Sequence, residues 1–186
     1  MTVPGDFYRV RKKHMKKLKV YVGCALTDAS EEYKAAIGVF KNTLRETGFI
    51  EILDFVDFSA DNEPPEKIPG IIYYHDIRVC VRKADVVLGE VSISSSGLGY
   101  ELATTIEKYQ RPVYIFAKKS PDVRVSKLIL GIPTHNPKVQ LHWYRDSFDE
   151  VVFTIIKELQ EIHRRKNQWI PVRILYWLHK KINHSN

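Results

Sequence analysis

Apolar runs alternate with amphipathic stretches along most of the chain. Runs rich in β-branched and apolar residues predict five buried strands, at 18–26, 50–57, 84–92, 111–119 and 138–144. Between them, apolar residues recur at helical spacing over about 31–47, 71–83, 96–108, 122–130 and 146–165. Continuous apolar strands separated by helices are typical of a parallel sheet that is covered on both faces. We therefore predict an α/β fold with a doubly wound, five-stranded parallel sheet, flavodoxin- or Rossmann-like, plus a C-terminal helix.

The ends of several segments carry typical boundary residues. Ser30, followed by two glutamates, is a typical helix N-cap, and Gly48 is a typical stop after the first helix. Within the segment 71–83, a short helix is expected to begin near His75. The stretch 58–70 is polar and contains prolines, and its length suggests a function beyond connecting two elements.

The length of 186 residues suits one domain, with 44% hydrophobic and 27% charged residues. We predict a basic N-terminal tail (1–17, part of which resembles a cloning tag), a catalytic-type domain (18–165) and a basic, amphipathic C-terminal helix (166–186). Docking or oligomer formation is a more common role for such a helix than membrane binding.

The net charge of +7 is unevenly distributed. Residues 1–19 and 163–186 each carry +6, so the middle of the chain carries −5. Basic ends of this kind are usually solvated, and no specific nucleic-acid partner is predicted from them. Two cysteines, no apolar run near the ~20 residues that span a bilayer and no visible signal peptide together predict a cytoplasmic protein.

In a doubly wound sheet, ligands bind beyond the carboxyl ends of the strands. Three stretches meet there: "GCALTDAS" (23–30), the loop 58–70, and "VSISSSGLGYE" (91–101). The last one places small residues before a helix N-terminus, which suits an anion. It lacks the Gly-Lys-Ser/Thr of a Walker loop and the third glycine of a dinucleotide fingerprint, so on its own it is a weak phosphate motif.

Glu101, at the end of that stretch, adds a second kind of chemistry. A glutamate in the first turn of a helix can simply complement the helix dipole. However, Asp76 is predicted to reach the same cleft from another element. Two carboxylates at one cleft suit glycoside chemistry, because one can attack the anomeric carbon while another group assists the leaving group.

The stretches "KVYVGCAL", "YYHDIRVCVRKADVVLGEVS" and "SSSGLGYELATTIEKYQRPVYIF" together resemble the nucleoside 2-deoxyribosyltransferase family, including its nucleotide-hydrolase relatives. The resemblance covers roughly residues 18 to 145. It implies that Glu101 is the nucleophile that attacks C1′ of the sugar. It also implies that Asp76 assists at the base, with His75 as the alternative.

Six residues before the nucleophile, the resemblance separates two substrate types. Family members that act on free nucleosides tend to carry an aspartate there, and relatives that act on 5′-monophosphates carry serine. This chain has Ser95, which favours a 5′-phosphate because a serine does not repel the dianion. The first loop departs from the hydrolase pattern, since Cys24 and Thr27 replace a serine- and glycine-rich run. The predicted substrate-binding residues are Tyr21, Gly23, Cys24, His75, Ser92, Ser95, Ser96, Gly97 and Gly99.

Several of these residues have ordinary structural alternatives. Tyr21 is a strand aromatic of a kind more often found in a core, and Cys24 suits a small buried position better than a thiol nucleophile. Glu90, at the end of the third strand, is expected to serve mainly structural hydrogen bonds. His135 and His142 lie seven apart without a nearby ligand partner, so we predict no metal site, and no cofactor is implied.

The leading hypothesis is an enzyme that cleaves the N-glycosidic bond of a (deoxy)nucleoside or nucleoside 5′-monophosphate and transfers the sugar to another base or to water. It would be a transferase or a hydrolase, and the resemblance implies a homodimer or larger homo-oligomer. The alternative is a nucleotide-sensing module of the same fold without turnover. Nucleic-acid binding through the basic tails is a third hypothesis.

Overall fold

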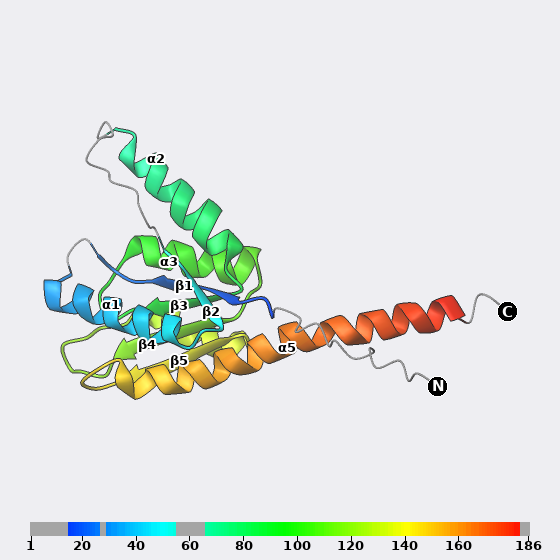
Figure 1. The fold of residues 1–186 in the computed structure, drawn as a ribbon. Coiled ribbons are helices and arrows are strands. Elements are labelled where there is room, and N and C mark those ends of the chain that lie inside the picture. Colours follow the sequence, from blue (N-terminus) through cyan, green and yellow to red (C-terminus); the bar gives the residue numbers. More distant parts are fainter. Residues whose placement is uncertain (1–14, 27–28, 55–65, 183–186) are drawn as a thin grey trace.

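The computed structural model describes residues 15–26, 29–54 and 66–182, and its centre is a five-stranded sheet (Figure 1). All neighbouring strands are parallel, in the order β2-β1-β3-β4-β5. The predicted doubly wound α/β fold is confirmed, and the strand order is the flavodoxin-like one. The strands are β1 (Leu18–Gly23), β2 (Ile50–Leu53), β3 (Val86–Glu90), β4 (Val113–Lys118) and β5 (Val139–Tyr144).

Helices cover both faces of the sheet. Side chains of α1 and α5 pack on one face, and those of η2, α3 and α4 pack on the other. The helical elements are α1 (Glu31–Glu46), α2 (Ile68–Tyr73), the π-helical η2 (Tyr74–Val81), α3 (Ser96–Ala103), the π-helical η3 (Thr104–Lys108), α4 (Lys127–His135) and α5 (Asp149–Ile182).

The boundaries of α1 follow the sequence signals. The Oγ of Ser30 accepts a hydrogen bond from the backbone N–H of Tyr33 at 3.2 Å, which satisfies one of the first N–H groups of the helix. After the helix, Gly48 has φ of +76°, a conformation that glycine adopts without a steric penalty. Both predicted boundaries are confirmed.

Two helices begin at other residues than the sequence predicts. The helix expected to begin near His75 begins at Ile68, because Pro69 is well tolerated in a first turn. The helix expected over 122–130 is α4, which starts after Ser126 and continues through Pro133. Two β-branched valines precede that start, at 123 and 125, and weaken helix formation there.

The C-terminal helix is continuous with the one before it. Separate helices were expected at 146–165 and within 166–186, whereas α5 runs as one helix from Asp149 to Ile182 and extends past the sheet (Figure 1). The intervening residues 166–168 contain neither glycine nor proline, so nothing in that stretch ends the helix. The tail 1–14 and most of the loop 58–70 lie outside the described residues.

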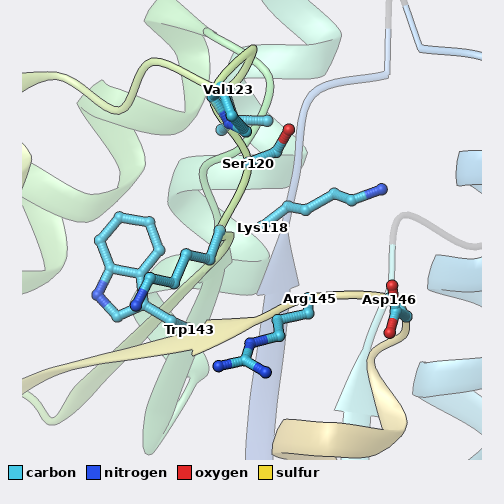
Figure 2. Close-up of a pocket in the computed structure, with 8 residues that line it drawn as sticks. Lys118, Ser120, Val123, Trp143, Arg145 and Asp146 are labelled. Atoms are coloured by element: carbon cyan, nitrogen blue, oxygen red, sulfur yellow. The ribbon is translucent and has the colours of Figure 1, made fainter.

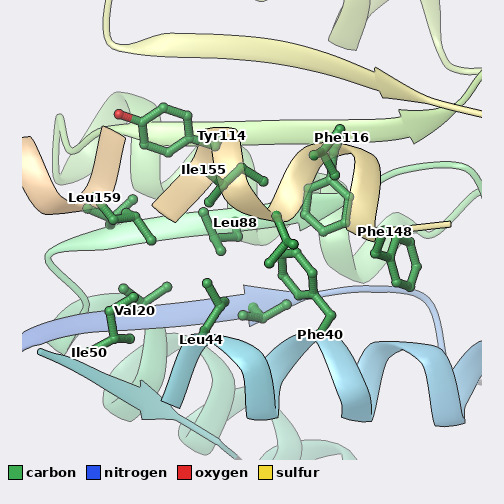
Figure 3. Close-up of a cluster of buried hydrophobic side chains, with 14 of the residues drawn as sticks. Val20, Phe40, Leu44, Ile50, Leu88, Tyr114, Phe116, Phe148, Ile155 and Leu159 are labelled. Carbon is green, nitrogen blue, oxygen red and sulfur yellow. The ribbon is translucent and has the colours of Figure 1, made fainter. Parts of the chain in front are cut away.

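The strands alternate their side chains between two cores. Leu18, Val20, Leu88 and Phe116 point to the α1–α5 face, where Phe116 contacts Phe40 with ring centroids 5.1 Å apart (Figure 3). The intervening strand residues pack against the opposite layer of helices. Among the described residues, no helix combines the length and the apolar character needed to cross a bilayer.

Substitutions on α5 should separate its buried face from its exposed face. Ile155 is fully buried, whereas Phe153 on the same helix is 67% exposed. We expect Ile155→Ala to lower the free energy of unfolding by about 2–5 kcal/mol, since it leaves a cavity in the core. Phe153→Ala should change it by no more than about 0.5 kcal/mol. Urea unfolding followed by circular dichroism measures both, and equal effects would contradict the packing described above.

Candidate active site

Two glycines allow helix α3 to lie very close to the sheet. Gly23 of β1 and Gly89 of β3 are paired in register. A Cβ atom on Gly23 would lie 2.6 Å from Oε2 of Glu101, and one on Gly89 would lie 2.9 Å from Cδ2 of Leu102. Both distances are too short for a real Cβ atom, so a larger residue at either position would displace the end of the Glu101 or Leu102 side chain. The face of α3 that carries Glu101 is therefore pressed onto the sheet.

The start of α3 fixes where Glu101 lies along the helix. The Oγ of Ser95 accepts a hydrogen bond from the backbone N–H of Leu98 at 3.2 Å and caps the helix. With the first helical residue at Ser96, Glu101 is the sixth residue and lies beyond the first turn, which contains no acidic residue. The dipole-complementing role considered from the sequence is therefore wrong, because the effect is confined to the first turn.

Glu101 lines a cavity of about 240 Å³ near the carboxyl ends of β1 and β2. The structure brings four predicted site residues into the same cavity wall: Glu101 from α3, Asp76 from η2, and Tyr21 and Cys24 from β1 and the segment after it. The other lining residues are Val22, Leu26, Lys41, Asp54 and Ile72.

Burial and a neighbouring charge make Glu101 an unusually weak acid. Its side chain is buried, and this burial together with the negative charge of Asp76 raises its pKa from 4.5 to about 7. A hydrogen bond from Tyr21 acts in the opposite direction, since it favours the charged carboxylate. Glu101 thus changes its protonation state at a much higher pH than an exposed glutamate does.

Asp76 is also shifted toward its protonated form. Burial raises its pKa, and the nearby positive charges of His75 and Lys41 partly offset this effect. The two carboxyl groups therefore interact through their charges, since the charge of Asp76 raises the pKa of Glu101. Such a pair can supply one charged nucleophile and one proton donor within the same cavity.

Tyr21 and Cys24 keep their protons at neutral pH. Burial and the charge of Glu101 raise the pKa of Tyr21, so its hydroxyl remains a hydrogen-bond donor to that carboxylate. Burial raises the pKa of Cys24 to about 11. The thiol is therefore protonated at neutral pH, which disfavours a role as nucleophile.

His75 is partly buried next to Asp76, and its ring lies 5.8 Å from that of Tyr74. It is not among the residues that line the Glu101 cavity, although its charge acts on Asp76. Its role as the alternative assisting group stays a prediction.

The serine loop lines a different cleft. Ser94, Ser95 and Ser96 face a space of about 320 Å³ that also contacts Arg124 and Ser126. The Oγ of Ser95 is already engaged in capping α3. The described linings of this cleft and of the Glu101 cavity share no residue, although residues of α3 line both spaces. Gly97 and Gly99 lie in the first turns of that helix, and their role in substrate binding stays a prediction.

A second buried carboxylate, Glu90, holds the start of the serine loop. It is fully buried and accepts hydrogen bonds from the hydroxyls of Tyr33, Tyr144 (2.9 Å) and Ser92, and from the N–H of Ser92. The Oγ of Ser92 in turn accepts from the N–H of Lys118 at 2.6 Å. Glu90 thus has the structural role expected from the sequence, and it fixes the end of β3 to that of β4.

Sequence reasoning missed Lys41 and Asp54, which form an ion pair in the cavity wall with Nζ and Oδ1 2.8 Å apart. Arg45 also pairs with Asp54. One signal was present: Asp54 is the first residue after β2, at the ligand-binding edge of the sheet. The partner, Lys41, lies on α1 and becomes adjacent only when α1 packs beside β2.

A larger depression of about 740 Å³ lies beyond the ends of β4 and β5 (Figure 2). Its wall includes Lys118, Trp143, Arg145 and Asp146. It contains none of the predicted site residues and no pair of carboxyl groups. We therefore place the candidate active site at the smaller cavity. Within the described part of the chain, no group of three His, Cys, Asp or Glu residues is arranged to hold a metal ion.

No family model matches the chain. Two curated relatives, both named "Putative 2'-deoxynucleoside 5'-phosphate N-hydrolase 1", do match it. The protein from Methanosarcina mazei is 28% identical over 88 residues, which cover 47% of this chain and 52% of the relative. The protein from Methanosarcina barkeri is 31% identical over 96 residues, or 50% and 57% of the two chains. The chain spans about half the length of the curated relatives it matches.

A solved structure, the CMP N-glycosidase of Clostridium botulinum, aligns over 76% of this chain and 98% of its own, with a TM-score of 0.52 and 14% identity. At that identity the likeness shows a shared fold. The resemblance to the nucleoside 2-deoxyribosyltransferase family is confirmed.

The buried carboxyl group of Glu101 in this candidate site should lower the free energy of unfolding once it is ionised. The pKa of Glu101 is higher in the folded protein than the 4.5 of an exposed glutamate, so the folded state loses stability as pH rises from about 4.5 through 7. Glu101→Gln removes the charge and keeps an acceptor for Tyr21. We expect it to raise the free energy of unfolding at pH 8 by up to about 3 kcal/mol, and by much less at pH 5. Urea unfolding at the two pH values measures this, and an equal change at both would contradict it.

Proposed function

We propose that this protein cleaves the N-glycosidic bond of a nucleoside 5′-monophosphate, with a 2′-deoxynucleotide as the favoured class. One observation carries the proposal: the buried carboxyl group of Glu101 and the half-buried one of Asp76, from separate elements, line one cavity, and Tyr21 donates a hydrogen bond to Glu101. The relatives named as hydrolases of 2′-deoxynucleoside 5′-phosphates support the substrate class.

The reaction has two steps. A carboxylate oxygen of Glu101 attacks C1′, the bond between C1′ and the base nitrogen breaks, and its electron pair leaves with the base. The carboxyl group of Asp76 supplies the proton that neutralises the departing base. Water or a second base then attacks C1′ and releases Glu101, so the configuration at C1′ is retained after two displacements.

The neighbouring cleft suits the 5′ end of the substrate. Ser94 and Ser96 supply hydroxyl groups, the start of α3 supplies backbone N–H groups, and Arg124 supplies a positive charge. A phosphate in this position would be bound by neutral donors and one cation. No carboxylate lines the cleft, so nothing there repels the dianion.

Hydrolysis is the favoured second step, because the relatives and the solved structure are named for N-hydrolase and N-glycosidase activity. The sensing module considered from the sequence is not favoured for the same reason. Transfer to another base, a cytoplasmic location and a homo-oligomeric state stay predictions of the sequence.

The first test is a panel of deoxynucleosides, ribonucleosides and their 5′-monophosphates, with free base measured by chromatography. We expect base release from 5′-monophosphates, and Glu101→Ala should lower kcat by at least about a thousandfold because the nucleophile is lost. Glu107→Ala, an exposed glutamate that follows on the same helical segment, should leave release unchanged. Unchanged release in Glu101→Ala would falsify the mechanism.

The pH dependence should respond to the neighbours of Glu101 in opposite directions. Activity requires the ionised form, so kcat/KM should rise with pH and level off above about 7. The charge of Asp76 raises the pKa of Glu101, so Asp76→Asn should move this rise to lower pH. Tyr21 lowers that pKa through its hydrogen bond, so Tyr21→Phe should move the rise to higher pH.

Each profile is normalised to its own plateau, because both substitutions also lower the rate itself. If the rise in kcat/KM stays at the same pH in the two variants, or moves in the same direction in both, Glu101 does not control the pH profile.

A further inference from the structure

The ion pair in the cavity wall places a fixed cation beside the candidate acids. Lys41 and Asp54 are mostly buried, with side chains 22% and 13% exposed, and their charged atoms are 2.8 Å apart. Arg45 holds the other carboxylate oxygen of Asp54. Among the described residues that line the cavity, Lys41 is the cation, and it shares the space with Asp76 and Glu101.

This part of the wall offers a ligand the N–H donors of Lys41. Each oxygen of Asp54 is already bound by a cation, one by Lys41 and one by Arg45. The ammonium group of Lys41 has three N–H groups and uses one of them on Asp54, so two can donate elsewhere. The cluster of one carboxylate and two cations also carries a net positive charge. A ligand atom that contacts this cluster is therefore favoured if the atom is a hydrogen-bond acceptor with partial negative charge.

The position of Lys41 corresponds to the base end of the substrate. In the proposed function Glu101 attacks one side of C1′, and the base leaves on the opposite side, where Asp76 assists. The charge of Lys41 acts on Asp76 and on Cys24, so the ammonium lies near both groups. The serine cleft, which suits the 5′ end, does not contain Lys41.

We propose that Lys41, held by Asp54, donates a hydrogen bond to a carbonyl oxygen of the nucleobase and so selects bases with an oxo group over bases with an amino group at that position. The inference rests on the proposed function. An amino group on the base would place its N–H donors against those of Lys41, so neither group would find an acceptor. A base with an amino group at that position is therefore strongly disfavoured. The same contact stabilises the charge that accumulates on the carbonyl oxygen as the base departs with its electron pair.

The test compares substrates that differ at one exocyclic group. The 5′-phosphates of deoxyinosine and deoxyadenosine form one pair and those of deoxyuridine and deoxycytidine form the other, with an oxo group in the first member and an amino group in the second. The pair with the faster turnover is used. We expect the wild-type protein to favour the oxo substrate in kcat/KM by about tenfold or more.

Lys41→Met should remove this preference, since it keeps the length of the side chain and loses its donors. The oxo substrate should lose at least about tenfold more kcat/KM than the amino substrate. Lys41→Arg keeps a charged donor and should retain part of the preference. Lys34→Met is the matched control, because Lys34 forms an exposed ion pair with Glu31 on the same helix, and it should leave the preference unchanged.

Binding of the same nucleotides to Glu101→Ala, which lacks the nucleophile, provides a second readout. The ratio of the two Kd values should fall when Lys41→Met is added. Equal losses for both substrates in Lys41→Met, an unchanged ratio, or a wild-type preference for the amino base would each overturn the inference while base release still supports the proposed function. Absence of base release with an intact Lys41-dependent Kd ratio would instead overturn the proposed function.

Discussion

The close contact between helix α3 and the sheet determines the chemistry of the candidate site. Gly23 and Gly89 lie side by side on β1 and β3 and leave room for Leu102 and the carboxyl group of Glu101. The backbone carbonyl of Glu101 is held as well, since the buried hydroxyl of Thr105 donates to it at 2.8 Å. The carboxyl group thus has little freedom to move toward water. Its weak acidity, its interaction with Asp76 and its access to the cavity all follow from this one packing arrangement.

The two buried glutamates show that burial alone does not produce a reactive carboxylate. Glu90 is more deeply buried than Glu101, yet hydroxyl and N–H groups from Tyr33, Tyr144 and Ser92 surround it with donors. Its negative charge is satisfied within the protein, and its oxygens do not line the cavity. Glu101 has one side-chain donor, Tyr21, and a neighbouring negative charge. An under-bonded acid of this kind gains from a positively charged ligand centre such as an oxocarbenium-like transition state.

The sequence predicted the parts of the molecule that depend on local pattern. The five strands, the Ser30 cap and the stop at Gly48 follow from residue types and spacing. The pairing of Glu101 with Asp76 was predicted from the two carboxylates at one cleft, the resemblance implied their roles, and both residues line the same cavity. The ion pair of Lys41 and Asp54 could not be predicted, because it depends on β2 lying at the edge of the sheet beside β1. The length of α5 was missed because residues 166–168, between the two amphipathic patterns, contain no glycine or proline, and the helix continues through Pro171.

The serine loop is anchored at both ends. Ser92 is bonded to Glu90 and to the backbone of Lys118, and Ser95 caps α3, so only Ile93 and Ser94 separate the two anchors. A loop this short between two fixed points is already in one shape before any ligand arrives. Binding there requires little additional ordering of the chain, and the loss of conformational entropy on association is correspondingly small. In the proposed function, discrimination among 5′ substituents at this loop would come from a preorganised template and not from closure around the ligand.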